Sequence, residues 1–79
     1  MTQPLPQTVG IDISKMHLDA HAYPCGDARQ FANTAPGFVA LRKWTGQWPV
    51  ERIAYEATGT YHRAFEQALA DSPLVRINP

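Results

Sequence analysis

Cysteine is almost absent from this chain of 79 residues. The single thiol, Cys25, excludes an internal disulfide and a metal site built from several cysteines. It lies in the Pro-Cys-Gly-Asp stretch at 24–27, which predicts a turn. A reducing compartment, the cytoplasm, is the simplest expectation for a chain of this kind.

An excess of charge of one sign is also lacking, because seven basic residues balance seven acidic ones. Bulk electrostatics therefore give no support to nucleic-acid binding, although they leave a local basic patch open. No apolar run approaches the roughly 20 residues that a membrane span needs, so we expect no membrane partner. Residues 1–7 have two prolines and no basic or apolar region, which predicts a disordered lead-in and not a secretory signal.

What remains is the composition of one small globular domain, with 44% hydrophobic and 18% charged residues. Alternation with period two predicts strands, and apolar spacings of three and four predict helices. The strands are expected at 9–13, 17–23, 28–33, 51–56 and 74–77, and the helices at about 34–47 and 60–71. Three meandering strands followed by two crossover units give an α/β fold with one mixed five-stranded sheet and the first strand at its centre.

Both predicted helices carry one apolar stripe, which we expect to face the core. The stripe of the first helix is Phe38, Leu41, Thr45 and Trp48, and that of the second is Tyr61, Phe65 and Leu69. Side-chain caps are expected from Asn33 or Thr34 at the first helix and from Thr58 or Thr60 at the second.

Asp12 is the conspicuous residue of the first strand. The strand alternates β-branched residues with small ones, so we expect both of its faces to be dry and the strand to be buried. A carboxylate there is costly to bury without a partner. Asp12 therefore either holds a cation or accepts hydrogen bonds from the Ser14 and Lys15 amides as an ordinary strand-end residue.

Glu56 ends the fourth strand as Asp12 nears the end of the first. If the two strands are parallel neighbours, the two carboxylates lie across one strand spacing, about 4.8 Å. Two acids without a cysteine or a nucleophile triad suit a hard cation such as Mg²⁺, which supports phosphodiester chemistry. The alternative is that Glu56 only stabilises the start of the following helix.

Three histidines and one lysine are further candidate site residues. His17 and His21 flank Asp19 on one face of the second strand, which we interpret as a wet surface and, less readily, as a metal site. His62 near the second helix is interpreted as a helix-surface residue, with proton transfer as the alternative. Lys15 is either a solvated turn residue or a phosphate contact beside Asp12.

Four stretches then carry a resemblance: V-G-I-D-I-S-K at 9–15, A-N-T-A-P-G-F at 32–38, Y-E-A-T-G-T-Y at 55–61 and R-I-N-P at 76–79. Together they resemble the N-terminal part of a DEDD transposase, one of the insertion-sequence transposases with a RuvC-like, ribonuclease H-like catalytic domain. By this resemblance, residues 8–79 form the N-terminal part of such a domain.

The resemblance implies that Asp12 and Glu56 are catalytic metal ligands, the first two of four family acids. It implies Mg²⁺ or Mn²⁺, in a two-metal arrangement, for cutting and joining DNA during transposition. The implied partners are donor and target DNA ends, a structured guide-type RNA and a second copy of the full-length protein. Nucleic-acid contacts are expected from Lys15, Thr58, Thr60 and His62. The remaining acids, and the serine of a later domain, lie beyond the matching stretches, so we expect this chain alone to be an inactive, incomplete module.

Two other classes of function stay open. An actin-like sugar kinase or ATPase also begins with a strand carrying Gly-Ile-Asp, but its phosphate-binding glycines are replaced here by Ser14, Lys15 and Met16. A nucleic-acid-binding module without catalysis would instead depend on the dispersed basic residues Lys15, Arg42, Lys43, Arg52, Arg63 and Arg76. An affinity for DNA or RNA that falls with salt and is unaffected by Asp12→Ala would favour this module.

Overall fold

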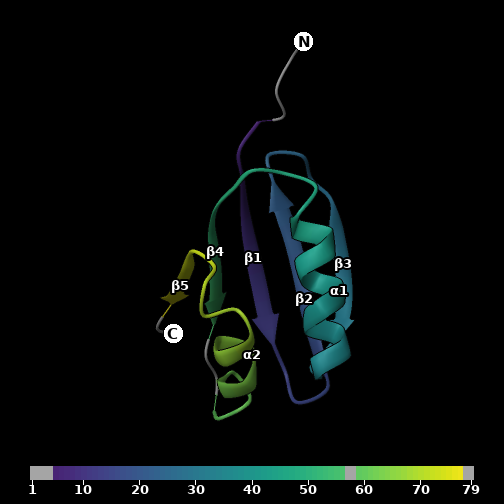
Figure 1. Ribbon diagram of the computed structural model, residues 1–79, viewed down its shortest axis with the longest axis vertical. Helices are drawn as coiled ribbons and strands as arrows, with labels where there is room; N and C mark the ends of the chain where they lie inside the picture. Colours follow the sequence, from purple (N-terminus) through teal and green to yellow (C-terminus); the bar gives the residue numbers. More distant parts are fainter. Residues whose placement is uncertain (1–4, 57–58, 78–79) are drawn as a thin grey trace.

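Five strands and two helices follow one another in the predicted order, in a computed structural model that describes residues 5–56 and 59–77 (Figure 1). The strands are β1 (Gln7–Ile13), β2 (His17–Tyr23), β3 (Ala28–Ala32), β4 (Val50–Glu56) and β5 (Leu74–Ile77). The helices are α1 (Ala35–Thr45) and α2 (Arg63–Ala68). The predicted α/β class with a mixed five-stranded sheet is confirmed.

The sheet has β1 at its centre, in the order β3-β2-β1-β4-β5. The short turn after β1 makes β2 antiparallel to it, and the Ser14 amide closes this turn by donating to the His17 carbonyl at 2.9 Å. The chain then crosses over through α1 and returns as β4, parallel to β1 on its other side. The central position of β1 and its parallel pairing with β4 are thus as predicted.

The first strand begins earlier than expected, at Gln7. The backbone amide of Gln7 donates to the Pro49 carbonyl at 2.8 Å, and the side-chain carbonyl of Gln7 accepts from the Cys25 amide at 2.9 Å. Gln7 is only 3% exposed. The expectation that residue 7 belongs to a disordered lead-in is therefore wrong, because its side chain ties β1 to the turn after β2.

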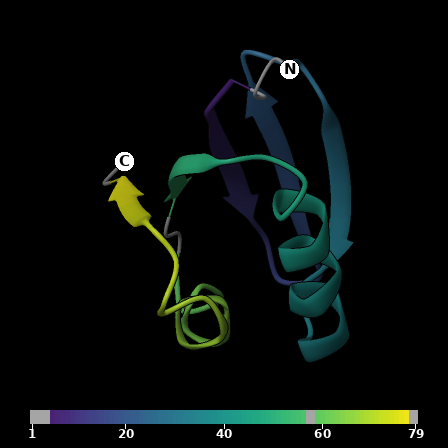
Figure 2. The ribbon, with the colours of Figure 1, turned by 45° about the horizontal axis from the view of Figure 1, so that its top comes forward.

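One face of the sheet carries the core and both helices. In Figure 1, α1 lies in front of β2 and β3, and Figure 2 shows α2 on the same side as α1. Every second residue of β1 points into the core between the sheet and the helices; these residues are Val9, Ile11 and Ile13. The largest fully buried side chains are Phe65, Leu18, Leu41, Leu69 and Val9.

The opposite face has no helix over it among the described residues. On β1 it carries Thr8 and Gly10, which are half-buried, and Asp12, which is exposed. The expectation that both faces of β1 are dry is therefore wrong. Small residues on a strand suit both close packing and an open surface, and here the surface is open.

Helix α1 is capped and packed much as predicted. The Thr34 hydroxyl accepts from the Gly37 amide at 3.3 Å, which satisfies one of the unpaired donors of the first turn. Phe38, Leu41 and Thr45 are buried, but Trp44 is buried as well. Trp48 follows the helix and packs edge-on against Trp44, with ring centroids 5.0 Å apart.

Gly37 allows α1 to approach the end of β3. A Cβ atom on Gly37 would lie 1.8 Å from the Ala32 carbonyl oxygen, so no larger residue fits without moving the backbone. The glycine therefore fixes the contact between α1 and β3.

Helix α2 is shorter than the predicted 60–71. Residues 60–62 form turns instead of helix, so Tyr61 is 48% exposed and His62 is buried in its place. Phe65 and Leu69 are fully buried as predicted. The residue before the helix is His62, and no side chain caps it. Neither helix in the described part of the chain has the length and apolar character needed to cross a membrane.

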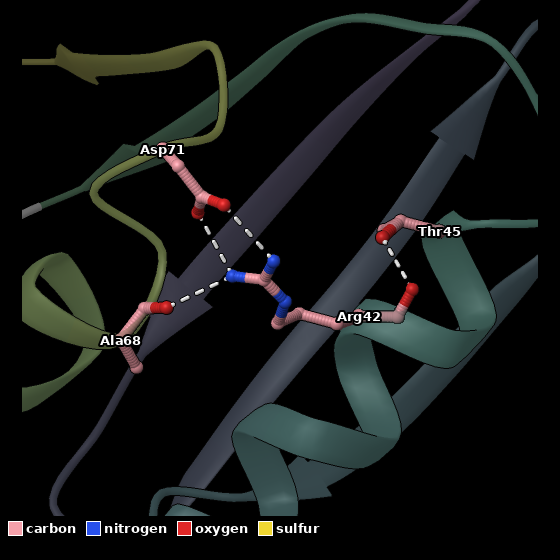
Figure 3. A network of polar contacts seen from close by, with 4 residues as sticks. All are labelled: Arg42, Thr45, Ala68 and Asp71. Carbon is pink, nitrogen blue, oxygen red and sulfur yellow. Dashed lines mark hydrogen bonds and ion pairs between the residues drawn. The ribbon is translucent and has the colours of Figure 1, made fainter.

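Arg42 joins the two helices from the outside (Figure 3). Its guanidinium donates to both carboxylate oxygens of Asp71, at 2.9 and 3.1 Å, and to the Ala68 carbonyl at 3.0 Å. The hydrogen bond from Arg42 holds the pKa of Asp71 below its usual range. This bidentate contact holds the end of α2 against α1.

Candidate functional site

The open face brings Asp12 and Glu56 together. The two residues are direct partners in the parallel register of β1 and β4, near the carboxyl ends of both strands. Their positions alternate with buried neighbours, so both side chains are exposed on the open face. The predicted juxtaposition is confirmed, whereas the metal-binding and catalytic roles remain predictions.

The simpler explanation for Asp12, a strand-end hydrogen bond, finds little support in the contacts. The Ser14 amide is used by the His17 carbonyl, and the Ser14 hydroxyl is engaged with the same residue. No side-chain hydrogen bond or ion pair to Asp12 occurs among the described residues. The described contacts therefore give the Asp12 carboxylate no structural role in the fold.

A third carboxylate lies in the same row. Asp19 on β2 is the direct antiparallel partner of Asp12, so Asp19, Asp12 and Glu56 cross three neighbouring strands. Gln30 donates to Asp19 at 2.9 Å and partly satisfies it. The period-two pattern of β2 pointed only to its own histidines as neighbours of Asp19, and the pairing with Asp12 was not predicted. If Ile13 and Leu18 pair across the short turn, the next pair along the two strands is Asp12 and Asp19. This register could have been predicted from the sequence.

The His17–Asp19–His21 row is not a ready-made metal site. The strand pairing gives each residue a different neighbour: His21 lies beside Gly10, and His17 beside Ala32. Over residues 5–56 and 59–77, no three His, Cys, Asp or Glu side chains are placed to hold a metal ion together. Both histidines are exposed, which confirms the interpretation as a wet surface.

Asp12 and Glu56 nevertheless fit a magnesium ion. Mg²⁺ is usually held by one or two carboxylates, with water and substrate phosphate oxygens completing its shell. Two exposed carboxylates on adjacent strands supply such a donor set. We would expect them to bind weakly without a phosphate ligand, because too few protein ligands are present.

Beside the carboxylates, the open face is hollowed. The hollow has a volume of about 230 Å³ and lies over Gly10 and Ala54. His21 and Tyr23 also line it, and Asp12 and Glu56 lie along it. The carboxylate pair therefore borders a space that a small planar group can enter from solvent.

The remaining predicted contact residues are scattered. Lys15 is exposed in the turn after β1, within a few residues of Asp12. Thr60 is exposed before α2, and it is not the predicted cap. Thr58 lies outside the described residues. The interpretation of His62 as a surface residue is wrong, since it is 7% exposed and leaves little area for nucleic acid.

His62 instead belongs to a polar network on the helix side of the sheet. Its Nε2 atom lies 3.6 Å from one carboxylate oxygen of Glu66, and the Tyr55 hydroxyl donates to the other. Burial first, and the bond to Glu66 second, raise the pKa of Tyr55 to about 12. This network was not predicted from the sequence, because the turn residues before α2 decide which side chains of the helix face the core.

Comparison with protein-family models finds no model that matches this chain, and a search of curated proteins finds no match either.

Proposed function

We propose that this chain forms the N-terminal part of a ribonuclease H-like domain of a DEDD transposase. The resemblance of its four sequence stretches is the starting point. The single observation that supports it best is the direct pairing of Asp12 and Glu56 at the carboxyl ends of parallel neighbours. Ligand sites of open α/β sheets commonly lie at that edge.

The proposed chemistry follows from the carboxylates. A divalent cation bound there supplies charge neutralisation and activation of water or a hydroxyl at a phosphodiester. Asp12 and Glu56 would hold the cation and set its distance from the sheet. Lys15, in the adjacent turn, would hold a neighbouring phosphate by its charge.

The order of the elements is compatible with this proposal. An antiparallel meander followed by parallel strands puts one acid on the central strand and the second on its parallel neighbour. This chain would supply two of the four acids, so full strand transfer is proposed for the complete protein. DNA ends, a structured RNA and a second protein copy belong to the same proposal.

The experiment that tests the proposal is a titration with Mn²⁺, followed by the electron paramagnetic resonance signal of the free ion. Asp12→Asn and Glu56→Gln should each weaken binding about tenfold or more, because ligand charge sets affinity for hard cations. Asp71→Asn is the matched control, since it removes the same charge from an acid paired with Arg42.

Equal Mn²⁺ affinity in wild type and Asp12→Asn would overturn the metal site. If oligonucleotide binding nevertheless persisted with a steep salt dependence, a binding module without catalysis would be the better assignment.

A further inference from the structure

Gly10 has no explanation in the folding of the sheet. Among the described residues, glycines with positive φ occur only at Gly26 and Gly59, so Gly10 has a backbone that any residue adopts. A Cβ atom on Gly10 would meet nothing within 4 Å, in contrast to the close approach at Gly37. A glycine inside a strand is less stabilising than an alanine, because glycine loses more backbone freedom on folding. This position therefore gives up stability without a packing reason.

The missing side chain creates the hollow on the open face. Gly10 pairs with His21 on one side and Ala54 on the other, so two small residues lie beside an imidazole ring. Asp12 and Glu56 lie one ladder step further, about 6.6 Å along the strands. The floor of the hollow is consequently flat and directly adjoins the carboxylate pair.

His21 and Tyr23 form the aromatic wall of this hollow. Their rings are nearly parallel, at 19°, with centroids 6.5 Å apart. Tyr23 is 57% exposed although it is a large aromatic residue. Exposed rings of this kind stack on nucleobases, and one stacked base contributes about 1–3 kcal/mol.

A positively charged side chain, that of Arg52, lies at the far end of the same face. Arg52 on β4 pairs in register with Thr8, and Thr8 pairs with Tyr23. Arg52 is exposed. The open face thus presents, in order along β1, a carboxylate pair, a hollow with aromatic rings and a guanidinium. This order matches one extended strand of nucleic acid: a phosphate at the carboxylate pair, a base in the hollow and the next phosphate at the guanidinium.

We propose that the hollow at Gly10 binds one base of a single-stranded nucleic acid, stacked on the His21–Tyr23 rings. The inference deepens the proposed function and rests on it, because it places the neighbouring phosphodiester at Asp12 and Glu56. Tyr23 and His21 are then positioning residues that align the strand with the carboxylates.

The test measures binding of a fluorescein-labelled oligothymidylate by fluorescence anisotropy in Ca²⁺, which permits binding without cleavage. Gly10→Val fills the hollow, and Tyr23→Ala removes the platform. Tyr23→Ala should weaken binding about 5- to 150-fold, which is the stacking energy converted at 1.36 kcal/mol per tenfold. Tyr23→Trp should retain the affinity of the wild type.

The thermal midpoint separates binding from folding. Gly10→Val should keep or raise the midpoint, because valine favours a strand and a Cβ atom at this position meets nothing within 4 Å, yet it should lose affinity. Ala32→Val and Tyr61→Ala are matched controls, because both alter exposed residues that do not line the hollow. Both controls should bind as the wild type does.

Unchanged affinity in Gly10→Val and Tyr23→Ala overturns the base site, as does a wild-type chain that binds no oligonucleotide. Thymidine monophosphate that binds as tightly as the oligonucleotide also overturns it, by indicating a free nucleotide as ligand. Mn²⁺ affinity, measured in the same variants, should stay at the wild-type value. A base site that fails while Mn²⁺ binding to Asp12 persists leaves the proposed function standing.

Discussion

At the scale of single residues, the open face collects negative charge that the fold does not neutralise. Asp12 lies between Asp19 and Glu56 in adjacent strands, and like charges directly opposite one another destabilise a sheet. Only Asp19 has a side-chain donor, Gln30, among the described residues. The row is thus a strained feature of the metal-free chain, which a bound cation would relieve.

Asp12→Asn should raise the thermal midpoint of the metal-free chain. Relief of repulsion of about 0.5 kcal/mol corresponds to about 3 °C in a domain of this size. Thermal unfolding in a chelator checks this. Asp27→Asn is the contrasting control: it should lower the midpoint, because Asp27 accepts from the Trp44 indole and the Ala28 amide. A fall of several degrees in Asp12→Asn would mark Asp12 as a structural residue.

Tyr55→Phe should lower the free energy of unfolding by about 1 kcal/mol near pH 8, the net value of one hydrogen bond. The pKa of Tyr55 is about 12 in the folded chain, above its ordinary 10.0. The contribution of this hydroxyl is therefore fully present below pH 10 and is lost as the pH rises through 12. Unfolding measured from pH 8 to 12 should show the wild type losing its advantage over the variant.

Tyr61→Phe is the control for the loss of a tyrosine hydroxyl, because Tyr61 is exposed. It should change the free energy of unfolding near pH 8 by less than about 0.5 kcal/mol. A constant difference between wild type and Tyr55→Phe over the whole range would contradict the assignment.

At the scale of elements, α2 depends on a few contacts. It spans only Arg63–Ala68, too short to be stable alone. Phe65 anchors it, with its ring 5.2 Å from Tyr55 and 6.3 Å from Phe38 between centroids. Arg42 holds its end from α1.

Phe65→Ala should reduce the free energy of unfolding by about 3–5 kcal/mol, since the side chain is fully buried. A domain this small has few kcal/mol to spare. Urea unfolding followed by tryptophan fluorescence measures the loss. Tyr61→Ala, four residues earlier and exposed, should change stability by less than about 0.5 kcal/mol. Equal effects of the two changes would contradict the packing described for α2.

The sequence predicted these elements unequally, for physical reasons. Alternation in β1 and β4 and the crossover through α1 were enough to pair Asp12 with Glu56. The phase of α2 was not predictable in the same way, because residues 60–62 adopt turns that shift Tyr61 out and His62 in. Extending the apolar stripe from Phe65 to Tyr61 assumes that residues 60–62 are helical, and in the structure they are not.

At the scale of the whole molecule, the core is one-sided. Both helices cover one face of the sheet (Figure 2). The other face carries the candidate site. The sequence could not reveal this, because Gly10 and Ala54 fit equally well under a packed layer and beside an open hollow. The edge strand β5 adds exposed Val75 and Ile77 to the same open face. An open apolar edge of this kind is a natural contact area for another molecule.

The pairing of β1 with two different partners has a consequence for folding kinetics. β1 meets β2 through a short turn, but it meets β4 only after β2, β3 and α1 have been passed. Contacts distant along the chain form late, because loop closure opposes them. We therefore expect the Asp12–Glu56 pair to form late in folding, when β4 docks on β1. A cation that recognises both carboxylates would bind only chains that have completed this step, and would slow their reopening.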